Sequence, residues 1–324
     1  MKARSVDVRD SLGLVLGYDL TEVVPGGRKG AVLRRGHVIR DEDLETLRRI
    51  GKSAVKVLEL EPGEVHEDDA AQRLARLAAG PGLEVEMPGE AWADVRATQD
   101  GLLKVDAVRL LRVNSVGELL IAARADNSPL KRGNFAAKVK VLGLVVSEER
   151  LVAAERIGAG EPLMSILPFH RLNAGIIVTG REVCEGRVKD AFGPLLRERL
   201  AAYGSEVSQV VIVPDEAADV AAGVRKMLAE KLDLILVTGG MSPDDSTPDG
   251  IRQAGAEVAF YGAPVSPGAM TLVAYADETP VVGIPAGLLT GRRGLFDLIL
   301  PRILAGERLG PEDAAAYGHG GLLV

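Results

Sequence analysis

Three short, uniformly apolar segments in the second half of the chain constrain the fold more strongly than any other feature. They cover residues 176–178, 210–213 and 234–237, and each is followed by small or acidic residues. Helical stretches separate them, and strands that are buried on both faces have continuous apolar runs of this kind. The pattern predicts an α/β domain, a mostly parallel sheet with helices on both faces.

The residues directly after these segments are the first candidates for a binding site. In a parallel sheet, ligands bind in the crevice outside the carboxyl ends of the strands. The turn Thr238-Gly239-Gly240-Met241-Ser242 offers a hydroxyl group and successive backbone N–H groups that can surround an anionic oxygen. This turn predicts a phosphate cradle, and the alternative is a tight connection between a strand and a helix.

Two carboxylates stand near neighbouring strand ends. Asp215 follows the second apolar segment, and Asp245 precedes a Thr-Pro helix start after the third. Such a pair can hold Mg²⁺ or steer a metal oxyanion, because both require oxygen ligands and charge neutralisation. The alternatives are a helix N-cap for Asp215 and an Asx-type turn for Asp245.

Two later loops are rich in proline and glycine. Residues 264–270 contain Pro267 and Gly268, and residues 281–287 contain Pro285 and Gly287. Loops of this composition can close over a flat ligand, although they also occur as plain connections. Arg292 and Arg293 precede the last predicted helix, where they could meet a phosphate or remain solvated.

Composition limits the classes of partner. The net charge of −7 and an aromatic content of 3% argue against nucleic acid, which needs a basic face and aromatic rings for stacking. Cys184 is the single cysteine, which excludes an intrachain disulfide and favours a packed, inert thiol and a cytoplasmic location. No secretory signal or membrane-spanning segment is predicted.

The first half of the chain has a mixed α+β pattern. A helix is predicted over residues 41–50, a strand over 54–58, a helix over 70–79 and a strand-rich stretch over 105–151. We expect four parts: an N-terminal segment over residues 1–61, a strand-rich accessory region over 62–170, the α/β domain over 171–308, and a tail over 309–324.

Residues 173–306 resemble the molybdopterin-binding domain shared by molybdopterin adenylyltransferases and molybdenum insertases. Several short motifs occur in the order found in that family. They are Thr179-Gly180-x-Glu182-Val183, Gly186-Arg187-Val188-Lys189-Asp190, Val213-Pro214-Asp215, Thr238-Gly239-Gly240-Met241-Ser242, Asp245-x-Thr247-Pro248, Pro267-Gly268 and Gly283-Ile284-Pro285.

The resemblance implies roles for these positions. Asp215 and Asp245 would act on the bound pterin and hold Mg²⁺ or molybdate. The residues of the other motifs, Thr179, Gly180, Asp190, Thr238 to Ser242, Pro267, Gly268, Pro285 and Gly287, would contact the ligand. The chain departs from the family at Phe192, where asparagine is usual, and at Ala286 in the last loop, so binding is better supported than turnover.

Gly17 to Thr21 and Arg35 to Ile39 resemble the segment that precedes this domain in insertase-like proteins. The resemblance implies a cytoplasmic homo-oligomer of late molybdenum cofactor biosynthesis, meeting other proteins of that route but neither nucleic acid nor a membrane. It would be a transferase that adenylylates molybdopterin with Mg²⁺ and ATP, or one that inserts molybdate. The alternatives are a non-catalytic molybdopterin carrier or sensor, and a nucleotide-processing hydrolase on the same fold.

Overall fold

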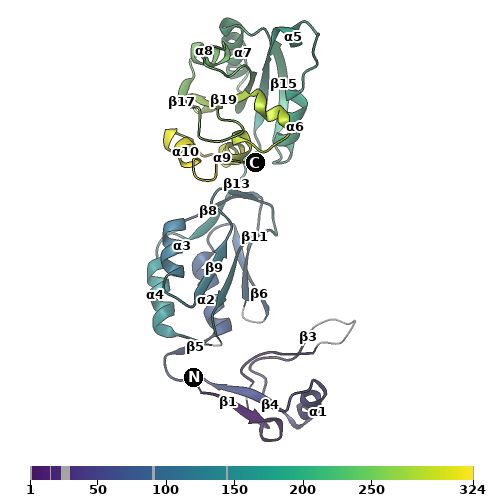
Figure 1. The fold of residues 1–324 in the computed structure, drawn as a ribbon, viewed down its shortest axis with the longest axis vertical. Coiled ribbons are helices and arrows are strands. Elements are labelled where there is room, and N and C mark those ends of the chain that lie inside the picture. Colours follow the sequence, from purple (N-terminus) through teal and green to yellow (C-terminus); the bar gives the residue numbers. More distant parts are fainter. Residues whose placement is uncertain (1, 15, 23–29, 90–91, 144, 324) are drawn as a thin grey trace. The chain divides into compact units, whose positions relative to one another are not determined.

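The computed structural model describes residues 2–14, 16–22, 30–89, 92–143 and 145–323 (Figure 1). Two compact units divide the chain. The first comprises Met1–Gln99 and Leu103–Ile166, and the second comprises Asp100–Leu102 and Leu167–Val324. Each unit has hydrophobic cores of its own.

The beginning of the first unit is built from two small antiparallel pairs and a helix. Strand β1 (Lys2–Asp7) pairs with β4 (Ala54–Glu59), and β2 (Leu20–Glu22) pairs with β3 (Gly30–Leu33). The short helix η1 (Val8–Asp10) follows β1, and α1 (Asp41–Arg49) begins with three acidic residues, which suit the positive end of a helix. The helix predicted over 41–50 and the strand predicted over 54–58 are both confirmed.

A four-stranded antiparallel sheet forms the centre of the first unit. Its order is β6 (Leu83–Gly89), β7 (Trp92–Ala97), β11 (Phe135–Val141) and β9 (Leu119–Ala123). Helix α2 (Glu67–Ala78) packs against β7, β9 and β11, and the predicted helix over 70–79 is confirmed. The remaining strands are β5 (Glu64–His66) with β12 (Val145–Ser147), and β10 (Ser128–Leu130), β8 (Gly101–Val105) and β13 (Met164–Pro168) in a three-stranded sheet.

Helix α3 (Ala107–Asn114) lies within the stretch predicted to be strand-rich, and it packs on α4 (Glu148–Gly158). The Arg109 guanidinium of α3 joins the two helices. It donates hydrogen bonds to the carbonyl oxygens that end α4 and follow it, those of Ile157, Gly158, Ala159 and Glu161. These carbonyls have no partner within their own helix, so Arg109 serves as their cap.

The second unit contains the predicted sheet. Its order is β15 (Glu206–Val213), β14 (Asn173–Thr179), β16 (Leu234–Gly239), β19 (Thr279–Pro285), β18 (Leu272–Ala276) and β17 (Glu257–Tyr261). The first four strands are parallel, β18 runs antiparallel to β19, and β17 runs antiparallel to β18. The predicted fold class is confirmed, an α/β domain after a mixed α+β region.

Helices cover both faces of this sheet because neighbouring residues of each strand point to opposite sides. On β14, Ile176 packs with α6 (Phe192–Ala201) and α9 (Leu295–Leu304), whereas Ile177 packs with α7 (Ala217–Ala229) and α8 (Thr247–Gln253). Two further short helices, α5 (Arg181–Cys184) and η2 (Ala286–Thr290), lie at the carboxyl ends of the strands.

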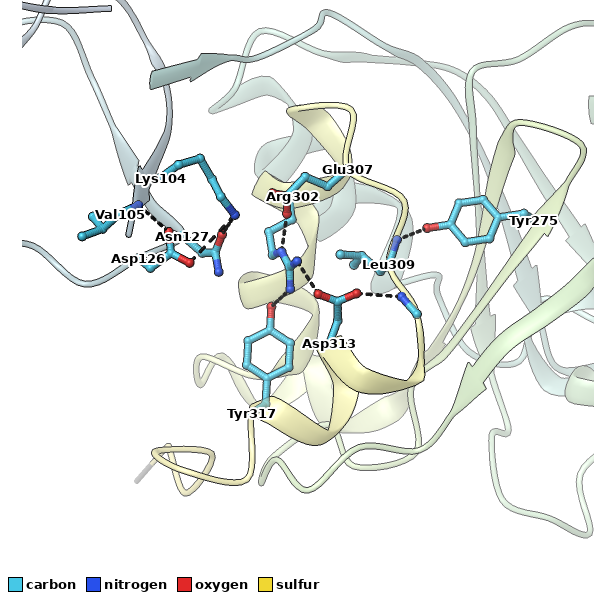
Figure 2. A network of polar contacts seen from close by, with 11 residues as sticks. Lys104, Val105, Asp126, Asn127, Tyr275, Arg302, Glu307, Leu309, Asp313 and Tyr317 are labelled. Carbon is cyan, nitrogen blue, oxygen red and sulfur yellow. Dashed lines mark hydrogen bonds and ion pairs between the residues drawn. The ribbon is translucent and has the colours of Figure 1, made fainter. Parts of the chain in front are cut away.

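The residues after α9 are tied to the second unit by a buried arginine. Arg302 is 8% exposed and donates to Glu307, to Asp313 of α10 (Pro311–Ala316) and to Tyr317 (Figure 2). Such a charge is stable in a protein interior only when its hydrogen bonds are satisfied.

Among the described residues, every helix is too short or too polar to cross a membrane.

Candidate functional site

The carboxyl ends of β14, β15 and β16 lie along one edge of the second sheet. Thr179 pairs with Val213, and Val178 pairs with Thr238 in the sheet register. The segments that leave these strands border a cleft of about 630 Å³. Its walls are formed by Val178, Thr179, Gly180, Arg181, Glu182, Val183, Val188, Lys189, Asp190, Ala191, Phe192, Asp215, Gly239, Gly240, Ala286 and Leu289.

The two glycines of the predicted cradle are required by close packing. Gly239 has a φ of +137°, and a Cβ atom there would lie 1.8 Å from Thr179 Oγ1. At Gly240 a Cβ atom would lie 2.5 Å from the carboxyl carbon of Asp245. The turn therefore brings Thr179 and Asp245 against its backbone, which a side chain at either glycine would prevent.

The two predicted acidic residues have different surroundings. The Asp245 carboxylate accepts a 2.6 Å hydrogen bond from the backbone N–H of Ser242, and its own N–H donates to the Ser242 carbonyl. The Asp215 carboxylate lines the cleft and accepts a hydrogen bond from the Ser246 hydroxyl at 3.0 Å. Asp245 thus supports the turn, whereas Asp215 faces the cleft.

Thr238 of β16 and Met241, which follows that strand, are both buried. Thr238 is fully buried, and its hydroxyl lies 3.5 Å from the Ile177 carbonyl. Met241 is 3% exposed, and its thioether packs where a side chain at Gly283 would otherwise lie. Of the predicted cradle, Gly239 and Gly240 line the cleft, and Ser242 is exposed on the turn beyond them.

Asp190 joins the cleft to helix α6. Its carboxylate accepts hydrogen bonds from the N–H groups of Phe192 and Gly193 at 2.8 and 3.0 Å. These are two of the N–H groups that have no partner within the helix, so Asp190 caps α6 while it lines the cleft. Phe192 is thereby held in the cleft wall, where it is 9% exposed.

The two proline and glycine loops meet in a second, much smaller crevice. Pro267, Gly268, Pro285 and Gly287 all line a space of about 10 Å³ with apolar walls. The Ser266–Pro267 bond is cis. The structure thus brings these four predicted residues together, but in a crevice of their own, while Ala286 between them lines the main cleft.

Several cleft residues were given no role from the sequence. Glu182 and Lys189 belong to the quoted motifs, and Arg181 occupies the variable position of the first motif, so membership of these motifs was the available signal. Arg181 forms an ion pair with Glu216 at 3.1 Å. Lys189 makes no ion pair within the part of the chain that the structure describes.

The structure changes the expectations for the Cys184 thiol and for Arg292 and Arg293. Cys184 is exposed, so the expectation of a packed thiol is wrong; α5 has only four residues and its segment leaves the sheet. Arg292 and Arg293 are exposed before α9 and are not among the residues that line the cleft. Within the described residues, no three His, Cys, Asp or Glu side chains are grouped so that they could hold a metal ion.

Comparison with solved structures gives weak overall matches. The protein CinA from Thermoplasma acidophilum has a TM-score of 0.36 and 19% identity over 41% of this chain and 98% of its own. The molybdopterin biosynthesis enzyme MoaB from Thermus thermophilus has a TM-score of 0.33 and 20% identity over 42% of this chain and 98% of its own. A molybdenum cofactor biosynthesis protein from Pyrococcus furiosus covers 94% of this chain and 64% of its own, with a TM-score of 0.29 and 14% identity.

Comparison with known sequences gives closer but shorter matches. CinA-like proteins from Mycobacterium sp. (strain JLS) and Mycobacterium tuberculosis are 47% and 43% identical over 76 residues, which are 23% of this chain. The match spans only 18% of the length of these relatives. Residues 5–59 match a domain of unknown function, and residues 175–305 match the family described as "probable molybdopterin binding domain". The second unit of this chain therefore contains a region, residues 175–305, that is similar to the molybdopterin-binding domain family.

Proposed function

We propose that the second unit binds molybdopterin in the cleft at the carboxyl ends of β14, β15 and β16, as a step of molybdenum cofactor assembly. The observation that carries the proposal is the position of this cleft, at the strand ends where the family motifs lie. Its volume of about 630 Å³ lies within the range of about 300–1,000 Å³ that is usual for small-molecule sites.

The walls of the cleft suit a ligand with a planar ring and an anionic end. Phe192, Leu289 and Ala286 supply an apolar wall on which a pterin ring can pack. Arg181 and Lys189 supply positive charge for the phosphate group, and Gly239 and Gly240 line the same cleft.

We further propose that the bound ligand is either adenylylated or loaded with molybdate, with Asp215 as the carboxylate that acts in the cleft. A magnesium ion needs few protein ligands when phosphate oxygens supply the others. Asp215 could therefore hold one beside the ligand, where it would neutralise the charge of a transferred phosphoryl group. Asp245 would act indirectly, by keeping the turn in place for the ligand.

A second candidate is a carrier that binds molybdopterin without transforming it. The bond between the Asp245 carboxylate and the Ser242 N–H favours this candidate, since it leaves Asp215 as the acidic residue of the predicted pair that lines the cleft. Its prediction is tight binding with no product.

The test is a titration of the full chain with molybdopterin, with and without Mg²⁺ and ATP, that follows binding and product together. Asp215→Asn should abolish product and keep binding within about twofold, whereas Asp219→Asn, an exposed position on α7, is the matched control and should change neither. Binding without product would support the carrier. Turnover of nucleotide in the absence of molybdopterin would indicate a nucleotide-processing hydrolase. A chain that does not bind molybdopterin would overturn the proposal.

A further inference from the structure

The four-stranded sheet of the first unit leaves one face open. Helix α2 packs on the other face. The open face, here called the outer face, is defined by Glu84 and Glu86 on β6, by Trp92, Asp94 and Arg96 on β7, by Phe135, Lys138 and Lys140 on β11, and by Leu120, Ala122 and Arg124 at β9. Trp92 is 39% and Leu120 is 42% exposed, so solvent reaches this face.

Cations and aromatic rings alternate across the outer face. The Arg96 guanidinium lies 3.7 Å from the centre of the Phe135 ring, and the Lys138 ammonium lies 4.5 Å from it. The Lys140 ammonium lies 5.0 Å from the centre of the Trp92 ring. These contacts hold the cations in place, so less conformational entropy is lost when they meet a partner.

The β11 and β9 side of the outer face is basic on a chain whose net charge is −7. On the β6 side, Arg96 is paired with Glu86 at 2.7 Å. Asp94 is 3% exposed and is bonded by Lys138 at 2.9 Å and by Arg96 at 3.3 Å. Lys140 makes no ion pair among the residues that the structure describes, and Arg124 donates from Nε to the Phe135 carbonyl. Three basic side chains, Lys138, Lys140 and Arg124, thus lie on the β11 and β9 side of the outer face, beside the one buried carboxylate of Asp94.

We propose that the outer face is a docking surface for an acidic, extended segment of a partner protein. Carboxylates of the segment would pair with Lys140 and Arg124, and its apolar side chains would pack on Leu120, Ala122 and the exposed part of Trp92. An extended segment places alternate side chains on one side, which matches the rows of a sheet face. Complementary charge of this kind selects partners and speeds their association.

The contacts on the outer face favour a peptide over nucleic acid. Bases bind to sheets by stacking on free aromatic rings, whereas Phe135 and Trp92 already carry cations of this chain over their rings. The acidic chain as a whole would repel a dense polyanion more strongly than a few spaced carboxylates. The proposal uses no residue of the cleft and is independent of the proposed function.

The test uses the full chain and the fluorescence of Trp92, which is the only tryptophan. The probe is a short peptide of alternating Glu and Val, and the comparison ligands are the corresponding Lys–Val peptide and oligo(dT). We expect a saturable change with the Glu–Val peptide that weakens as salt is added, and no saturable change with the Lys–Val peptide.

Lys140→Glu should weaken binding of the Glu–Val peptide by about tenfold, and the milder Lys140→Ala by a smaller factor in the same direction. Lys52→Glu, at an exposed position outside the sheet, changes the net charge equally and should leave affinity within about twofold. Equal affinity for Lys140→Glu and Lys52→Glu, or no saturable binding, would overturn the proposal. Tighter binding of oligo(dT) with the same dependence on Lys140 would replace the peptide with nucleic acid.

Discussion

Replacing Gly239 with alanine tests how the strand-end turn is built. Two costs are expected. The φ of +137° is a conformation that side chains other than glycine rarely adopt, which costs about 1–3 kcal/mol. The new Cβ atom would also lie 1.8 Å from Thr179 Oγ1, and overpacking of this kind costs about 1–3 kcal/mol more. The free energy of unfolding should therefore fall by about 2–6 kcal/mol in total.

Urea unfolding followed by far-ultraviolet circular dichroism measures this change. A loss of about 3 kcal/mol lowers the midpoint by roughly 1–3 M urea for slopes of about 1–3 kcal/mol per M. Gly255→Ala is the matched control for backbone strain alone, since Gly255 has a φ of +94° and no atom lies within 4 Å of its added Cβ. Hydrogen exchange should quicken in peptides from β14 and β16, whereas Trp92 fluorescence reports separately on the first unit.

Two double variants isolate the steric cost. Thr179→Ala removes Oγ1 and should restore part of the stability lost in Gly239→Ala, while Thr179→Val keeps an atom in that place and should restore none. Thr179 Cβ, at 3.1 Å from the added atom, limits the recovery to a part. Equal stability of the two double variants, or a Gly239→Ala variant no weaker than Gly255→Ala, would refute the reasoning.

Three further predictions concern single side chains. Asp190→Ala should lower the stability of the second unit by about 1 kcal/mol through loss of the α6 cap, and Glu198→Ala, at an exposed position within α6, should change it by less than about 0.5 kcal/mol in the same urea unfolding. Arg109→Lys should lower the stability of the first unit by about 1–3 kcal/mol, since an ammonium cannot reach the carbonyls that the guanidinium spans; an unchanged Trp92 unfolding transition would contradict this. Burial lowers the pKa of His66 below its ordinary value of 6.5, so the unfolded chain takes up a proton there first. Its contribution to stability is complete above pH 6.5 and is lost as the pH falls below that value, and His66→Gln should flatten the pH dependence of unfolding in that window.

The position of the cleft could be predicted from the sequence, but the contacts of the residues around it only partly. Motif order placed Thr179, Gly180, Asp215 and the Gly239-Gly240 pair at one sheet edge, and these residues line the cleft. The sequence could not show that the Asp245 carboxylate turns back to the Ser242 N–H, because that depends on the path of the turn. The crevice that gathers Pro267 and Pro285 likewise depends on how two loops far apart in sequence pack together.

The amino-acid sequence by itself determined the α/β sheet, because short, continuous apolar runs that alternate with helical stretches are typical of parallel strands covered on both faces. It also determined that the chain would have polar groups at the carboxyl ends of those strands. Tertiary structure alone decided which side chains became available there. It buried Thr238, used Asp190 as a helix cap, and placed Arg181 and Lys189 in the cleft wall. It also brought Trp92 and Lys140 side by side from separate strands, since pairing between strands, and not distance along the chain, sets which side chains meet.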